Sequence, residues 1–302
     1  VGNNALENQN FTTATDTFNV AVGVNAGNAI TTGANNTLIG ALAGDAITTS
    51  SSNTMVGTQA GTSLTSGDGT VFVGTSAGES TSTGAAGTLV GFQAGQFLTT
   101  GSNNVALGAK ALKGASTGAT ASNSVAIGAE AADAITSGTS NVAVGYQALS
   151  TETSGSKSVA IGTQALLNQL QGASAANTAV GDRAGLLTTD GIKNVYLGFD
   201  AALSATTANK NVVIGSQAAD SMTTGAENVF VGESCAGSGT ITGNDNVAVG
   251  RAAGLNLSSG SNNMFLGHDA GITGSPGGNF TTQSNNIVLG DENISLIRTA
   301  VS

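Results

Sequence analysis

A glycine that follows an aliphatic residue recurs along the whole chain at nearly constant spacing. Gly23, Gly40 and Gly57 begin a series that continues to Gly290. Of the 16 intervals between Gly2 and Gly290, 11 are 17 residues long, and the others are 18, 19, 20, 21 and 23. A fixed period of this size is typical of repeat architectures, in which each repeat packs on its neighbours. We call this glycine position 0 and number the other positions of each coil from it.

The composition excludes several classes of function. Charged residues make up 9% of the chain, and 8 basic against 18 acidic residues give a net charge of −10. This balance opposes binding to nucleic acids and to anionic membrane surfaces. The single cysteine, Cys235, cannot form a disulfide within the chain. No run of about 18 apolar residues is present, so the sequence predicts no transmembrane helix.

Strand-forming residues precede each anchor glycine. Position −1 is Val, Ile or Leu in every coil from Gly23 to Gly290, and position −3 is Val, Thr, Met or Ile. Their spacing of two places both on one face of a strand, which we expect to face the interior of the coil. Position −2 then faces outward, and it is apolar in many coils and never charged. Because a strand that is apolar on both faces is buried on both, we expect identical chains to cover this face. The expected trimer interface therefore consists of Leu38, Met55, Phe72, Leu89, Tyr196, Val213, Phe230 and Phe265.

Two further positions are nearly invariant within the repeats. Position −4 is Asn in 11 of the 15 coils from Gly23 to Gly267, which predicts a stacked Asn ladder. Position +3 is Ala in 14 of the same 15, and the exception is Cys235. A position that accepts only Ala or Cys is a cramped interior corner, so we expect Cys235 to act as a small buried hydrophobe.

A second glycine at position +10 predicts a second turn in each coil. It occurs in 12 of the 15 coils, and an apolar residue near +7, such as Ile30 or Leu98, precedes it. We expect a second short strand there, with the +7 side chain pointing inward. The fold class is therefore all-β: a parallel β-solenoid, or β-roll, of 17-residue two-strand coils over residues 1–290, assembled as a homotrimer. The extra residues of the 20-, 19- and 23-residue coils follow Gly118, Gly172 and Gly277, so we expect them to enlarge one corner.

Residues that could carry chemistry are few. His268 has no second histidine to share a metal, and Cys235 has no histidine in its coil. The carboxylates are scattered over predicted turns, whereas glycoside hydrolysis needs a close pair. No glycine-rich loop ends in Lys-Ser or Lys-Thr, so no phosphate-binding loop is predicted. We expect no catalytic, cofactor-binding or metal-binding residues, and we expect His268 to be an exposed turn residue.

The remaining aromatic residues are candidates for contact with a receptor. Phe92, Tyr146 and Phe199 occupy position +1, just past a turn. Packing between neighbouring coils or chains is the competing explanation for them. Asn279, Phe280 and Gln283 lie in the longest insertion and combine an aromatic face with amide groups, a set suited to sugars. These six residues are the predicted receptor contacts.

The repeats resemble those of known surface proteins. Asn123-Ser124-Val125-Ala126-Ile127-Gly128 resembles the head repeats of trimeric autotransporter adhesins, which form left-handed parallel β-rolls packed in threes. The run Asn141 to Leu149 (NVAVGYQAL) is similar to the version found in bacteriophage tail fibres. The period is longer than that of the usual adhesin head repeat. The stretch from Asn285 to Arg298 is similar to the segment that precedes the self-cleaving chaperone of many phage fibres.

This resemblance implies a host-attachment tail fibre: an extracellular part of a virion and a rigid trimeric rod without enzymatic activity. Its expected partners are two identical chains, other tail proteins and a host receptor or polysaccharide. The head of a bacterial trimeric adhesin is the alternative, and an ice-binding solenoid ranks below it. The opening Val1 to Leu6 matches Val144 to Leu149, so we expect a piece of a longer protein. Residues 291–302 are expected to lead to a chaperone domain that has been removed.

Overall fold

The computed structural model describes residues 1–10, 16–116, 118–170, 172, 174–291 and 293–294. These residues form sixteen strands of three residues each and no α-helix. The chain divides into two compact units, the first made of residues 1–158 and 172–174 and the second of residues 159–171 and 175–302. Each unit is a parallel β-solenoid, which confirms the fold expected from the 17-residue period.

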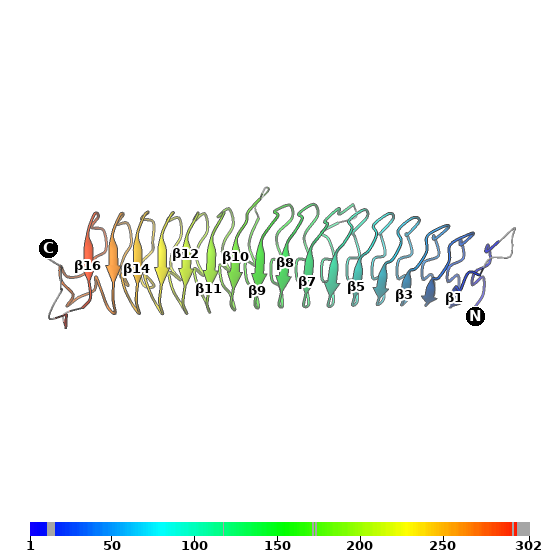
Figure 1. Cartoon of the computed structure of the whole chain (residues 1–302), viewed down its shortest axis with the longest axis horizontal. Coiled ribbons are helices and arrows are strands. Elements are labelled where there is room, and N and C mark those ends of the chain that lie inside the picture. The colour runs from blue at the N-terminus through cyan, green and yellow to red at the C-terminus, as the bar shows by residue number, and fades with distance from the viewer. Residues whose placement is uncertain (11–15, 117, 171, 173, 292, 295–302) are drawn as a thin grey trace, which may run out of the picture. The chain divides into compact units, whose positions relative to one another are not determined.

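The first unit contains eight parallel strands, each hydrogen-bonded to the strand of the next coil (Figure 1). They are β1 (Val20–Val22), β2 (Thr37–Ile39), β3 (Thr54–Val56), β4 (Val71–Val73), β5 (Thr88–Val90), β6 (Val105–Leu107), β7 (Val125–Ile127) and β8 (Val142–Val144). The register never slips: position −2 of one strand always pairs with position −2 of the next, as Met55 does with Phe72.

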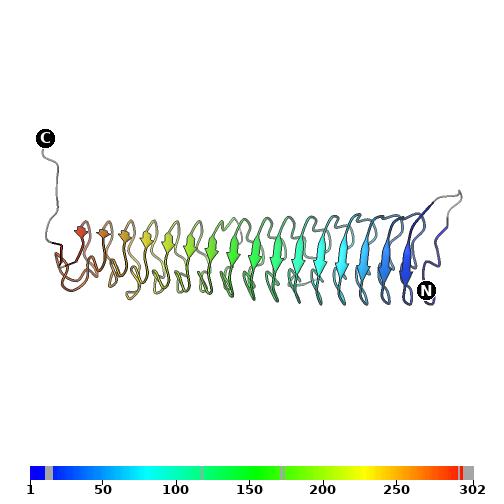
Figure 2. The ribbon, with the colours of Figure 1, turned by 60° about the horizontal axis from the view of Figure 1, so that its bottom comes forward.

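The second unit repeats the same pattern with eight more strands. They are β9 (Val159–Ile161), β10 (Thr178–Val180), β11 (Val195–Leu197), β12 (Val212–Ile214), β13 (Val229–Val231), β14 (Val247–Val249), β15 (Met264–Leu266) and β16 (Ile287–Leu289). In Figure 2 the strands of each unit form a single row. In both units the strand occupies positions −3 to −1, as the sequence predicts.

The expected second strand of each coil does not form. Beyond the named strands, the described residues contain only isolated bridges, such as Leu98 with Ala119. Backbone hydrogen bonds still join successive coils there, as from the N–H of Thr31 to the carbonyl of Thr48 at 2.9 Å. Left-handed residues break up the remainder of the coil, because positions 0, +2 and −5 have positive φ in nearly every coil. The coils are therefore one-stranded and not two-stranded.

The anchor glycine is required by a close approach of backbones. Gly74 has a φ of +136°, and a Cβ built there would lie 2.4 Å from the carbonyl oxygen of Gly91 in the next coil. Gly40 and Gly57 meet their neighbours in the same way. No other residue fits this column, since any side chain would strike the backbone of the following coil.

The orientation expected for the strands is wrong. Position −2 points into the coil and not outward. All eight residues expected at a trimer interface are at most 2% exposed within the single chain: Leu38, Met55, Phe72, Leu89, Tyr196, Val213, Phe230 and Phe265. The interior also contains the buried +3 alanines, Cys235 and the +7 side chains, which confirms those three expectations. Positions −1 and −3 form the outer surface of the sheet.

In some coils the interior side chains at −2 and +7 have opposite sizes. Ala21 and Ala126 share their coils with Ile30 and Ile135, which fill the space that alanine leaves. Tyr196 shares its coil with the small residue Ala205. Because these side chains occupy the same narrow interior, position −2 cannot face outward without leaving a void.

The predicted Asn ladder is present and buried. In the second unit it runs unbroken from Asn177 to Asn286. At each step the side-chain oxygen accepts a hydrogen bond from the backbone N–H of the next Asn, as from Asn194 to the oxygen of Asn177 at 2.9 Å. The side-chain N–H₂ of Asn194 also donates to the carbonyl oxygen of Ala208, at 2.8 Å. The ladder thus satisfies the polar backbone of a buried corner.

The insertions do not all enlarge one corner. In the longest coil the backbone N–H of Phe280 donates to the carbonyl oxygen of Gly271, the bond that a +7 residue makes to position +4. Its extra residues therefore precede Phe280 and do not lie beside the Asn corner. In the 19-residue coil the backbone N–H of Leu170 still makes the bond of position +8, to the carbonyl oxygen of Thr189 at 3.0 Å, and the positions that follow lie partly outside the described residues. The predicted C-terminal segment 291–302 lies largely outside the described residues.

Candidate functional site

In each unit the outer surface of the sheet is an apolar face. Position −1 is Val, Ile or Leu in all sixteen strands. Its side chains are widely exposed, as shown by Val22 at 42%, Leu107 at 48% and Leu197 at 43%. No charged residue occurs at −1 or −3 in any strand. Large exposed apolar surfaces of this kind mark sites of interaction.

The two columns of this face differ in polarity. Position −3 accepts threonine in four strands, for example Thr37 and Thr88, whereas position −1 never accepts a polar residue. In protein interfaces the centre is apolar and the rim is polar and accessible to solvent. The −1 column therefore has the character of an interface centre, and the −3 column that of a rim.

The predicted receptor contacts at position +1 are exposed. Phe92, Tyr146 and Phe199 are 51%, 49% and 46% exposed, as the sequence predicts. The guanidinium of Arg183 lies 5.2 Å from the ring centre of Phe199. The same Arg183 forms an ion pair of 2.6 Å with Asp200 in the next coil. A contact between these aromatic residues and a receptor remains a prediction.

The predicted contacts in the longest insertion differ in their exposure. Phe280 is 6% exposed and packs edge to face on Phe265, with ring centres 5.6 Å apart. Its expected exposure is therefore wrong, because it fills the +7 position of an enlarged coil. Asn279 and Gln283 are exposed. The Asn279 oxygen accepts a hydrogen bond from Asn256 at 2.8 Å, and the Gln283 oxygen accepts bonds from the backbone N–H groups of its own turn.

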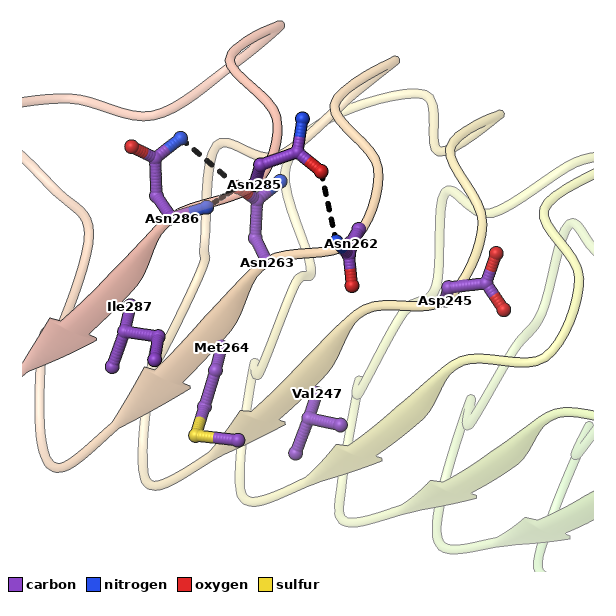
Figure 3. Close-up of a pocket in the computed structure, with 8 residues that line it drawn as sticks. All are labelled: Asp245, Val247, Asn262, Asn263, Met264, Asn285, Asn286 and Ile287. Atoms are coloured by element: carbon purple, nitrogen blue, oxygen red, sulfur yellow. Dashed lines mark hydrogen bonds between the residues drawn. The ribbon is translucent and has the colours of Figure 1, made fainter.

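A groove that the sequence does not predict lies beside the last three strands of the second unit (Figure 3). It encloses about 270 Å³. Figure 3 shows one row of aliphatic side chains on the strands and a second row of polar side chains at the preceding corner. The lining residues are Asp245, Val247, Asn262, Asn263, Met264, Asn285, Asn286 and Ile287.

The polar row comes from position −5 of three consecutive coils. Asp245, Asn262 and Asn285 all have left-handed backbones, with φ of 59°, 56° and 64°. The side-chain N–H₂ of Asn262 donates to the oxygen of Asn285 at 2.8 Å. Among the described residues, the Asn262 oxygen and the Asn285 N–H₂ have no protein partner. The sequence signal beside this groove is a run of four carbonyl-bearing residues at −5, from Glu227 to Asn285, of which the last three line it.

The titratable groups weighed from the sequence, His268 and Cys235, lie in different surroundings. Among the described residues no three His, Cys, Asp or Glu side chains are placed to hold a metal ion. His268 is half exposed and lies between Arg251 and the carboxylates of Asp269 and Asp291. Burial raises the pKa of the Cys235 thiol to about 12. The described part of the chain contains no helix long and apolar enough to cross a membrane.

Comparison with protein-family models, curated proteins and solved structures finds no match to this chain.

Proposed function

We propose that this chain is the repeat region of a bacteriophage host-attachment fibre, in which three copies pack through the outer faces of their sheets. The observation that carries the proposal is the −1 column, which is apolar in all sixteen strands and is exposed or partly exposed in every one of them in the single chain. It replaces position −2 as the centre of the proposed interface. The likeness of the repeats to those of phage fibres and trimeric adhesins supports the assembly and the attachment role.

The size of the face suits association between copies. Eight strands about 4.8 Å apart and roughly 10 Å of exposed width give about 400 Å² for each unit. The two units together offer about 800 Å² per chain, which each copy of a trimer shares between two neighbours, so the assembly would bury about 2,400 Å² in all. Because the face repeats at every coil, parallel copies in register present matching residues along their length. Leaving this face in water would favour aggregation.

The first alternative, the head of a bacterial surface adhesin, uses the same face and the same assembly. The ice-binding alternative has weaker support. Threonine hydroxyls at position +8 donate to the next coil, as from Thr31 to the carbonyl oxygen of Thr48 at 3.1 Å and from Thr206 to that of Thr223 at 3.1 Å. Their hydroxyl hydrogens are thus committed within the protein and not offered to an ordered water layer.

Sedimentation equilibrium tests the assembly. The chain has a mass of 29.0 kDa, and the trimer should have three times that mass. Replacing Val73 and Val231, both at −1, by Asp should prevent association, because it places unpaired charges in an apolar contact. Thr83→Asp with Thr224→Asp is the matched control, since both threonines are exposed and lie at position +9, outside the strands. A trimer that survives the valine substitutions contradicts the proposed interface.

Binding to intact bacterial cells tests the attachment role. Fluorescently labelled trimer should bind a subset of a panel of strains, and periodate oxidation of the surface glycans should reduce the binding when the receptor is a polysaccharide. Absence of binding to every strain would contradict the attachment function while leaving the trimer intact.

A further inference from the structure

We propose that the groove of Asp245, Asn262 and Asn285 binds one neutral pyranose ring of a glycan. The proposal rests on the attachment function only for the source of the glycan; the site itself is argued from the groove. At about 270 Å³ the groove lies just below the usual range of small-molecule sites, about 300–1,000 Å³, so it suits a single sugar ring and not a larger ligand.

The polar row matches the chemistry of adjacent sugar hydroxyls. The carboxylate of Asp245 and the oxygen of Asn262 accept hydrogen bonds, and the N–H₂ of Asn285 donates one. A hydroxyl group both donates and accepts, so neighbouring hydroxyls on one ring can satisfy such a mixed row. Since Asn262 and Asn285 are already joined by a 2.8 Å hydrogen bond, their free atoms are held in fixed directions.

The aliphatic row provides the second half of the site. Val247, Met264 and Ile287 lie side by side at position −3 of β14, β15 and β16. Met264 is 36% exposed and Ile287 is 71% exposed. These side chains can pack against the C–H groups of a sugar ring while the corner amides bind its edge. They belong to the −3 column, at the edge of the proposed interface, so the groove is open to a sugar only where a neighbouring copy does not cover that column.

The charge near the groove selects against acidic sugars. Asp245 lines the groove, and the next residue in the −5 column is Glu227. Among the described residues, Lys210 of the same column forms an ion pair with Glu227 at 2.5 Å. A uronic acid would bring a second carboxylate to a site where the Asp245 charge has no basic partner. A neutral hexose carries no such penalty.

The three methionines of the chain allow a direct test. Met55 and Met222 are fully buried, whereas Met264 lines the groove. In protein labelled with ¹³C at the methionine methyl groups, titration with methyl glucopyranoside, methyl mannopyranoside or methyl galactopyranoside should shift the Met264 signal saturably, and the other two signals serve as internal references. Because the groove holds one ring and has no aromatic wall, we expect a dissociation constant on the order of 1 mM. Methyl glucuronide should bind more weakly than the neutral sugars.

A pair of double variants provides the matched control. Asn262→Ala with Asn285→Ala should weaken binding at least tenfold. Alanine is tolerated at position −5, since Ala86 and Ala176 occupy it with φ of 54° and 50°. Asn103→Ala with Asn123→Ala removes an equivalent hydrogen-bonded pair, 3.3 Å apart, outside the groove, and it should leave binding unchanged.

Three results would overturn the proposal. The first is the lack of a Met264 shift with any neutral sugar up to about a hundred times the expected dissociation constant. The second is a shift that persists in the groove double variant. The third is protection of the Met264 methyl group from a soluble paramagnetic agent in a protein that sediments as a trimer, which would show that a neighbouring copy fills the groove. In that last case the proposed assembly stands and only the sugar site fails.

Discussion

The side-chain oxygen of Asn211 accepts two hydrogen bonds from Asn228 in the next coil, one from its backbone N–H at 2.9 Å and one from its side-chain N–H₂ at 3.1 Å. Both residues are fully buried. One carboxamide therefore satisfies a backbone donor that no strand partner reaches, and each step of the ladder depends on the previous one.

We expect the loss of stability on replacing Asn211 to depend on which buried hydrogen-bonding groups the new residue leaves unpaired. Asn211→Ala leaves the buried N–H of Asn228 without a hydrogen-bond acceptor and should lower the free energy of unfolding by about 3 kcal/mol. Asn211→Ser should cost roughly half as much, because Ser124 holds this position in another coil and its hydroxyl accepts the N–H of Asn141 at 3.2 Å. Urea denaturation measures both. Equal losses for the two variants would show that the acceptor is not what matters.

Replacing either of two glycines of the first unit should change the stability of the protein, but in opposite directions. Gly74→Ala places a Cβ within 2.4 Å of a backbone oxygen and should cost about 3–5 kcal/mol. Gly69 has a φ of +67° with nothing within 4 Å of a Cβ, and it occupies the −5 position that Asn35 fills elsewhere with a φ of 61°. Gly69→Asn should be neutral or stabilise by about 0.5 kcal/mol. Thermal unfolding distinguishes the two, and a destabilising Gly69→Asn would contradict this account.

Removing the hydroxyl of Tyr196 should not harm the fold. Burial raises the pKa of Tyr196, and the hydroxyl of Thr188 offsets this only in part. Neither hydroxyl makes a hydrogen bond of normal geometry. Because an unsatisfied buried hydroxyl costs free energy, Tyr196→Phe should stabilise the protein by about 1 kcal/mol. A loss of stability, measured by denaturant titration, would reveal a bond between the two hydroxyls that matters.

Cys235 should react only when its coils open. The side chain is fully buried and its thiol pKa is raised to about 12, mainly by desolvation, so little thiolate exists at pH 8. Labelling by a thiol reagent in native buffer should be at least a thousandfold slower than in denaturant. Labelling rates comparable in the two conditions would show that the interior of this coil is open to solvent.

Asp133 should make the stability depend weakly on pH. Burial raises its pKa above the ordinary value, although a hydrogen bond from Ser150 at 2.5 Å opposes the shift. A raised pKa in the folded state means that its contribution to stability is full below the unfolded pKa, about 3.9, and is lost as the pH rises through the folded value. Asp133→Asn should therefore be more stable than the original chain at pH 7, and this gain should disappear near pH 3. If Asp133→Asn raises the stability equally at pH 7 and pH 3, the gain does not come from the ionisation of Asp133.

The sequence predicts the path of the chain better than the direction of its side chains. The 17-residue period locates every strand and the Asn ladder, because backbone pairing between equal coils leaves no freedom of register. It cannot determine which face of the strand is inside, since both faces are apolar. The paired sizes of Ala21 with Ile30 and of Tyr196 with Ala205 do indicate the inner face. In each pair a small side chain accompanies a larger one, as expected for residues that together fill one interior. The groove at Asp245 depends on side-chain spacing across three coils, which a single repeat does not reveal.

Because the anchor glycines form the same contact between successive coils, the number of coils can change without a change in how the coils pack. Gly40 meets Gly57 through the same backbone contact by which Gly57 meets Gly74. A whole coil can therefore be gained or lost by recombination between like segments, and every junction that results is one already present in the chain. Length can change in whole steps of one repeat, so the reach of such a molecule can evolve without a redesign of its core.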